Sequence, residues 1–79
     1  MGNARRKPKH LARKLLAIRE RLGVSQTEMA RLLELKQTYT VVSSFESGRR
    51  EPDLIVLLEY ARLAGISTDV LIDDKTKLP

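Results

Sequence analysis

Apolar residues recur along the first third of this chain at helical spacing. Leu11, Leu15, Ile18 and Leu22 follow one another at steps of four, three and four residues. This spacing places them on one face of a helix. Gly23 then predicts the end of that helix, because glycine readily adopts the left-handed conformation of a helix C-cap.

A second helix is predicted by a capping signal. Ser25 is a favourable N-cap, and Glu28 stands three residues later, with Val24 just before the cap as a possible hydrophobic staple. The helix is expected to run from residue 26 to about residue 34. The residues predicted to face inward are Met29, Ala30 and Leu33.

The next segment is predicted to be a helix over residues 39–47, ending at Gly48. Val42 and Phe45 are three residues apart and would face the core. Thr38 could cap this helix. The stretch "TYTVV" is rich in β-branched residues, so a strand is the alternative from propensity alone.

Two shorter patterns complete the chain. Pro52 suits the first turn of a helix, which carries Leu54, Leu57, Leu58 and Ala61 and closes at Gly65. Ser67 is expected to cap a last short helix carrying Val70 and Leu71. The pattern therefore predicts an all-α fold of five short helices. The helical domain would span residues 9–73, between a flexible basic arm at residues 1–8 and a polar, fraying tail at residues 74–79.

Charge is distributed unevenly along these elements. The net charge is +5, with basic residues concentrated in residues 1–21 and acidic residues in residues 51–74. This asymmetry favours a polyanionic partner for one face. The chain has no cysteine and no apolar run long enough to cross a membrane, so a cytoplasmic protein without membrane contact is expected.

The sequence indicates neither an enzyme nor a cofactor. His10 is the only histidine, and it is far in sequence from Asp73 and Asp74, so a metal site is not expected. No nucleophile turn or oxyanion arrangement accompanies the serines.

The two central helices suggest a use. A short helix followed by a second helix with small polar side chains outward is the helix-turn-helix arrangement, whose second helix fits the major groove of DNA. The N-terminus of the preceding helix suits a phosphate, because its N–H groups and dipole favour an anion. Gln26, on its first turn, can add a side-chain donor.

These residues also resemble a known family. "IRERLGVSQTEMARLL" and "VSSFESGRREPDLIVLLEYARLAGIS" are similar to the Cro/lambda-repressor-type helix-turn-helix domain, also called the XRE family, over about residues 11–72. The matching positions are Arg19, Gly23, Ser25, Gln26, Ala30, Val42, Ser43, Glu46, Gly48, Pro52 and residues 63–65.

The resemblance implies that residues 39–47 form a recognition helix. The candidate base contacts are Tyr39, Thr40, Ser43 and Ser44, and the candidate phosphate contacts are Gln26, Thr38, Arg49 and Arg50. Arg5, Arg6, Lys7 and Lys9 could form an arm along the backbone or in a minor groove. The resemblance further implies a structural ion pair between Arg19 and Glu46.

One departure from the family affects the register of the recognition helix. The spacing from Gln26 to Glu46 is about two residues longer than is usual. Counting forward from Ala30 would make Gln37 and Thr38 base-facing. Counting back from Glu46 favours the set beginning at Tyr39, and this count is preferred because Val42 and Phe45 fix the helix phase.

The resulting expectation is a sequence-specific DNA-binding transcriptional regulator. It would be a repressor that binds double-stranded DNA as a homodimer on a palindrome, because one recognition helix covers few base pairs. Leu71, Ile72 and Leu78 are candidates for the dimer surface, and Tyr60 lies either in the core or on that surface. The alternatives are an antitoxin-type or other protein-interaction module, and non-specific RNA binding through the arm.

Overall fold

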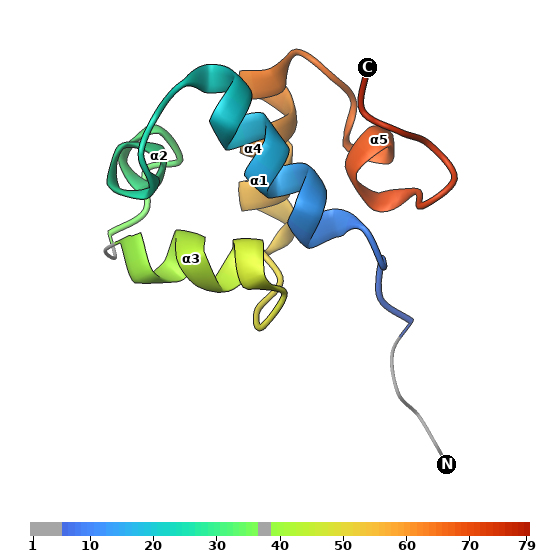
Figure 1. Ribbon diagram of the computed structural model, residues 1–79, viewed down its shortest axis with the longest axis horizontal. Coiled ribbons are helices and arrows are strands. Elements are labelled where there is room, and N and C mark those ends of the chain that lie inside the picture. The colour runs from blue at the N-terminus through green and yellow to red at the C-terminus, as the bar shows by residue number, and fades with distance from the viewer. Residues whose placement is uncertain (1–5, 37–38) are drawn as a thin grey trace.

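The computed structural model describes residues 6–36 and 39–79, and within these residues the chain is all-α (Figure 1). The helices are α1 (Leu11–Leu22), α2 (Gln26–Leu32), α3 (Tyr39–Ser47), α4 (Leu54–Ala64) and α5 (Thr68–Ile72). The predicted five-helix fold is therefore confirmed. Tyr39 to Val42 are helical, so the strand alternative for this stretch is wrong.

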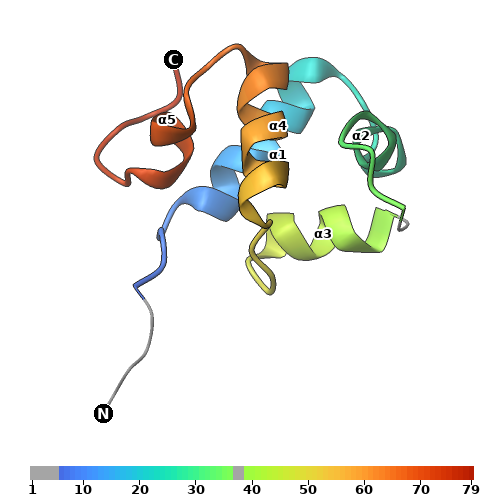
Figure 2. The same cartoon turned by 180° about the vertical axis from the view of Figure 1, so that it is seen from behind.

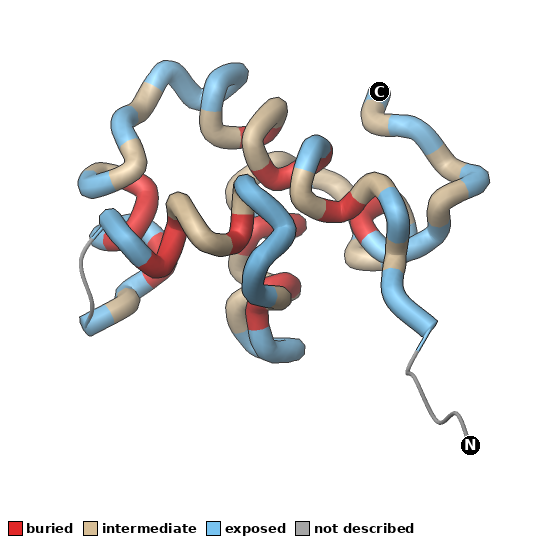
Figure 3. The backbone as a smooth tube through the Cα atoms, turned by 60° about the horizontal axis from the view of Figure 1, so that its bottom comes forward, coloured by how far each residue is buried: buried red, intermediate tan, exposed pale blue. Residues whose placement is uncertain are grey.

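Helix α1 occupies the centre of the molecule. It packs against α3, α4 and α5, while α2 packs mainly on α3. Figures 1 and 2 show α2 and α3 at one end of the α1/α4 pair and α5 at the other. In Figure 3 the buried positions recur along the inner sides of the helices. The core consists of Leu11, Leu15, Ile18, Met29, Ala30, Leu33, Val41, Val42, Phe45, Leu57, Tyr60, Ala61 and Leu71.

Most of the predicted core positions are confirmed, but two expectations are not. Leu22 continues the apolar face of α1 in sequence, yet it is 38% exposed because it lies on the last turn, where less of the chain covers it. Leu71 is fully buried, so it cannot belong to a dimer surface. Tyr60 is also fully buried, which settles its place in the core.

The helix ends agree only partly with the capping predictions. The Ser25 Oγ accepts a 3.0 Å hydrogen bond from the Glu28 backbone N–H, as predicted. Pro52 does not begin α4, because the Asp53 side chain caps this helix by accepting from the Val56 N–H at 2.9 Å. Ser67 occupies the N-cap position of α5 without a side-chain capping bond.

The turn after α2 contains an unusual backbone conformation. Glu34 has a φ of 57°, in the left-handed region that favours glycine. The Glu34 N–H donates to the Arg31 carbonyl at 3.0 Å, and the Leu35 N–H donates to the Ala30 carbonyl at 2.9 Å. The chain therefore ends α2 with a tight turn although no glycine stands there.

The C-terminal segment, residues 73–78, is held against α1 and not frayed as predicted. The buried Lys14 ammonium donates to the carbonyls of Val70, Asp73 and Thr76 at 2.7, 3.0 and 2.7 Å. Three donors meet three acceptors, which satisfies this buried charge. Leu78 also packs against the core. The polar sequence concealed these contacts because their partners are more than fifty positions away in the chain.

Candidate nucleic-acid interface

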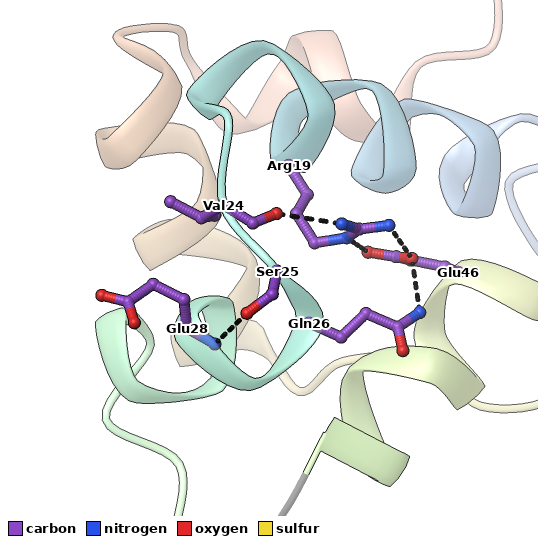
Figure 4. Close-up of polar contacts among 6 residues, drawn as sticks. All are labelled: Arg19, Val24, Ser25, Gln26, Glu28 and Glu46. Carbon is purple, nitrogen blue, oxygen red and sulfur yellow. Dashed lines mark hydrogen bonds and ion pairs between the residues drawn. The ribbon is translucent and has the colours of Figure 1, made fainter.

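Three side chains tie the ends of α1, α2 and α3 together (Figure 4). The Arg19 Nε lies 2.6 Å from the Glu46 Oε2, and the Arg19 Nη2 donates to the Glu46 Oε1 at 3.2 Å. The Gln26 Nε2 donates to the same Oε1 at 3.0 Å. The Arg19 and Glu46 side chains are only 17% and 6% exposed. This cluster fixes the recognition helix relative to α1 and α2.

Arg19 has a further role at the junction between α1 and α2. Its Nη1 donates to the Val24 carbonyl at 3.0 Å, so one guanidinium holds both α3 and the α1–α2 turn. The hydrogen bond to Glu46 raises the pKa of Arg19, against the lowering effect of burial. The ion pair that the family resemblance implies is thus present, with structural geometry.

Gln26 lies on the first turn of α2 beside Glu46. One of its amide N–H groups is used in that bond, and an amide carries two. The second can still donate to a group outside the protein, such as a phosphate. Its phosphate contact remains a prediction.

The outer face of α3 carries the four residues predicted to contact bases. Tyr39 is 55% exposed, Thr40 is exposed, and Ser43 and Ser44 are half-buried. The opposite face buries Val41, Val42 and Phe45, which fixes the rotation of the helix. The alternative residues Gln37 and Thr38 lie outside the described residues, as does the proposed cap by Thr38.

Hydrogen bonds connect α3 to the basic loop that follows it. The Ser44 carbonyl accepts from the Ser47 hydroxyl at 3.2 Å and from the Arg50 N–H at 3.2 Å. The Arg49 Nε donates to the Ser47 Oγ at 3.3 Å. The turn needs Gly48, whose φ of 81° suits glycine. The loop is therefore folded back onto the last turn of α3.

The Ser44 hydroxyl itself donates to the Val41 carbonyl at 2.7 Å. Such back-bonding is common for serine inside helices. Its oxygen lone pairs can still accept a hydrogen bond. We therefore expect Ser44 to act as an acceptor, opposite a donor such as an exocyclic amine.

A shallow hollow joins these elements into one surface. It has a volume of about 390 Å³ and is lined by Thr40, Val41, Ser44, Arg49 and Arg50. The structure thus brings two of the predicted base-contacting residues together with two of the predicted phosphate-contacting arginines. Small hydroxyl side chains beside guanidinium groups can donate to and accept from base edges and phosphate oxygens.

The base of the N-terminal arm lies next to the same loop. Lys7 and Lys9 are exposed and line a hollow of about 170 Å³ together with Gly48, Arg50 and Glu51. Figure 1 shows the arm leaving on the side of the molecule that carries α3 and the α3–α4 loop. Arg6 is exposed, whereas Arg5 lies outside the described residues.

Other kinds of site find no support in residues 6–36 and 39–79. This part of the chain contains no group of three or more histidine, cysteine or acidic side chains that could hold a metal ion. None of its helices is long and apolar enough to cross a membrane. His10 instead contacts Arg13, with 2.7 Å between the His10 Nδ1 and the Arg13 Nη2.

The fold and this surface define a helix-turn-helix DNA-binding protein of the transcription-regulator class. A helix-turn-helix family model matches residues 15–71, and the chain belongs to this family, in its Cro/lambda-repressor (XRE) branch. Among solved structures it resembles the P22 c2 repressor, crystallised in complex with the synthetic operator 9T in the presence of Tl⁺. The two chains are 20% identical with a TM-score of 0.72, over 81% of this chain and 94% of the repressor chain. Comparison with curated proteins finds no match.

Sequence reasoning missed two residues that shape this region. Val41 is buried beside Val42, although only the latter was expected to face inward. Asp74 accepts hydrogen bonds from the backbone at the base of the arm, from the Lys9 N–H at 2.9 and 3.0 Å and the His10 N–H at 3.1 Å. A short apolar pair could have revealed the first, but no local signal predicts the second.

Proposed function

We propose that this protein is a sequence-specific repressor that binds double-stranded DNA with α3 in the major groove. The observation that carries this proposal is the outer face of α3. Tyr39, Thr40 and Ser44 are accessible on a helix whose opposite face is locked into the core. A narrow, hydroxyl-rich helix can approach base edges, where hydrogen bonds distinguish base pairs. Ser43 would add a further contact on the same face.

Phosphate contacts would flank the recognition helix on both sides. Gln26 lies at the N-terminus of α2, and Arg49 and Arg50 extend from the loop after α3. The helix N-terminus favours an anion, and guanidinium groups bind phosphate oxygens bidentately. Such contacts would fix the register of α3 on the duplex without carrying sequence information.

We further propose that two copies bind together on a two-fold symmetric operator. Leu54 and Ile55, at the start of α4, are 79% and 67% exposed, and Ile72 at the end of α5 is 44% exposed. Leu54 and Ile72 line one hollow of about 330 Å³. Contiguous exposed apolar residues are typical of an interaction surface. Because α4 follows the α3–α4 loop directly, pairing through this patch would put both recognition helices on the same side.

The dimer can be tested with a charge on the patch. Leu54→Glu should raise the dimer dissociation constant in sedimentation equilibrium and abolish cooperative binding to a two-fold site. Leu22→Glu is the control, because Leu22 is also partly exposed but lies at the end of α1. Equal self-association of the two variants and the unsubstituted protein would contradict this surface.

Sequence reading can be tested by selection from a randomised duplex library, with fluorescence anisotropy on the enriched and unselected duplexes. The proposal predicts an enriched two-fold symmetric sequence and a steep salt dependence from phosphate contacts. Salt-dependent binding without enrichment would contradict sequence reading. Equal affinity for single-stranded RNA and duplex DNA would favour non-specific binding through the basic arm.

One alternative has support from a specific observation. The patch of Leu54, Ile55 and Ile72 could bind a different protein, as in an antitoxin whose DNA binding is secondary. A heterologous complex that Leu54→Glu disrupts, with operator affinity unchanged, would favour that function. As a DNA-bound regulator the protein would act in the cytoplasm.

A further inference from the structure

The C-terminal segment holds the backbone at the base of the N-terminal arm. The Asp74 carboxylate accepts from two consecutive N–H groups, those of Lys9 and His10, at 2.9 to 3.1 Å. Asp74 is in turn held in place because the adjacent carbonyls of Asp73 and Thr76 accept from the buried Lys14 ammonium. The anchor therefore reaches from α1 through the C-terminal segment to the arm.

This anchor sets where the arm begins and in which direction it leaves. Pro8, which is half-buried and has a restricted φ, directly precedes the anchored Lys9. Lys7 and Lys9 then lie along the hollow that Arg50 and Gly48 form on its other side. Figure 2 shows α5 and the C-terminal segment at the end of α1 from which the arm leaves.

Nothing local would otherwise keep the arm on this surface. His10 occupies the N-cap position of α1 without a side-chain capping bond. The Glu51 carboxylate also lines the hollow, between the lysines and the polyanion they would meet. A lysine contributes to phosphate binding only when its position beside the duplex is maintained, because free side chains and backbone lose entropy on binding.

We propose that Asp74 is a positioning residue for DNA binding, which holds Lys7 and Lys9 beside Arg50 so that the three cations meet the phosphate backbone together. This inference rests on the proposed function. It assigns the C-terminal segment a part in DNA affinity although that segment contributes a negative charge at this point.

The proposal reverses the sign expected from charge alone. Removing a carboxylate near a basic surface should strengthen the attraction for DNA. Asp74→Ala should instead weaken duplex binding, because the arm is released. Loss of one phosphate contact should also make the slope of log K against log salt less steep by about 0.9.

The experiment measures duplex affinity by anisotropy for the full chain at several salt concentrations. Asp74→Ala should bind about fivefold more weakly near 0.1 M salt, with a less steep slope. Asp69→Ala is the matched control, since Asp69 is exposed on α5 and its removal changes the net charge equally. Asp74→Asn keeps one acceptor oxygen and should lie between Asp74→Ala and the unsubstituted protein. If Asp74→Ala does not fold by circular dichroism, the comparison of Asp74→Asn with Asp69→Asn replaces it.

A double substitution separates positioning from general destabilisation. Lys7→Gln should weaken binding in the unsubstituted protein but have little further effect in the Asp74→Ala background. Additive effects, or binding by Asp74→Ala that equals or exceeds that of Asp69→Ala, would overturn the inference. If the unsubstituted protein shows no salt-dependent duplex binding, the proposed function itself fails and the inference falls with it.

Discussion

The Glu46 carboxylate at the end of α3 lies 2.6 Å from the Arg19 guanidinium of α1, and both side chains are largely shielded from water. Arg19→Met would leave this carboxylate buried without its cation. We expect the free energy of unfolding to fall by about 2–4 kcal/mol, somewhat below the cost of breaking a fully buried pair because Arg19 is partly exposed.

The control for this prediction is Arg31→Met, which removes an arginine from an exposed pair with Glu28. Surface pairs contribute little, so its cost should stay below about 1 kcal/mol. Chemical denaturation of both variants measures the difference. Equal losses would mean that the Arg19–Glu46 pair does not hold α3 in place.

Glu34 predicts a stabilising substitution. Its φ of 57° is costly for a residue with a side chain and free of that cost for glycine. Glu34→Gly should raise the free energy of unfolding by about 0.5–1 kcal/mol, the strain relieved less the added entropy of the unfolded chain. Glu34→Ala removes the same charge without relieving the strain and should give no such gain. A loss of stability in Glu34→Gly would show that the left-handed turn is not strained.

Tyr60 carries a buried polar atom without a partner in the described part of the chain. Its hydroxyl makes no hydrogen bond there, and burial raises the pKa of the phenol. Removing the hydroxyl removes a desolvation cost. Tyr60→Phe should therefore be neutral or stabilising by up to about 1 kcal/mol in thermal or denaturant unfolding. A loss above that size would reveal a partner for the hydroxyl.

Asp74 predicts a pH dependence of stability. Hydrogen bonds from the backbone N–H groups, that of Lys9 first, lower the pKa of its carboxyl in the folded state. A depressed folded pKa stabilises the protein above the unfolded value of about 3.9 and ceases to do so as pH falls through the folded value. Asp74→Asn should be less stable than the unsubstituted protein at pH 7, and the difference should shrink below about pH 4. A constant difference from pH 7 to pH 2 would contradict this assignment.

Much of the fold follows from local signals in the sequence. The spacing of Leu11, Leu15 and Ile18 predicts the buried face of α1, and Val42 with Phe45 predicts the phase of α3. The N-cap of α4 was also within reach, because Asp53 is a better cap than Pro52 is a first residue. These features depend on residues within a few positions of one another.

The remaining features depend on contacts between distant parts of the chain. Lys14 looks like any surface lysine in the sequence, yet carbonyls from α5 and the C-terminal segment surround its ammonium. Asp74 meets the arm 65 positions away. Neither periodicity nor capping patterns describe such pairs. The left-handed Glu34 is equally hidden, because the usual glycine signal is missing.

The central claim is that the outer face of α3 reads DNA sequence, and a selection repeated with a substituted α3 tests it most directly. Thr40→Ala and Ser44→Ala leave the buried face of the helix intact and keep the basic loop. The account predicts that each variant loses preference at one symmetric pair of positions in the enriched duplex and keeps the others. An unchanged consensus in both variants and in Tyr39→Ala would contradict the claim and place sequence recognition elsewhere on the protein.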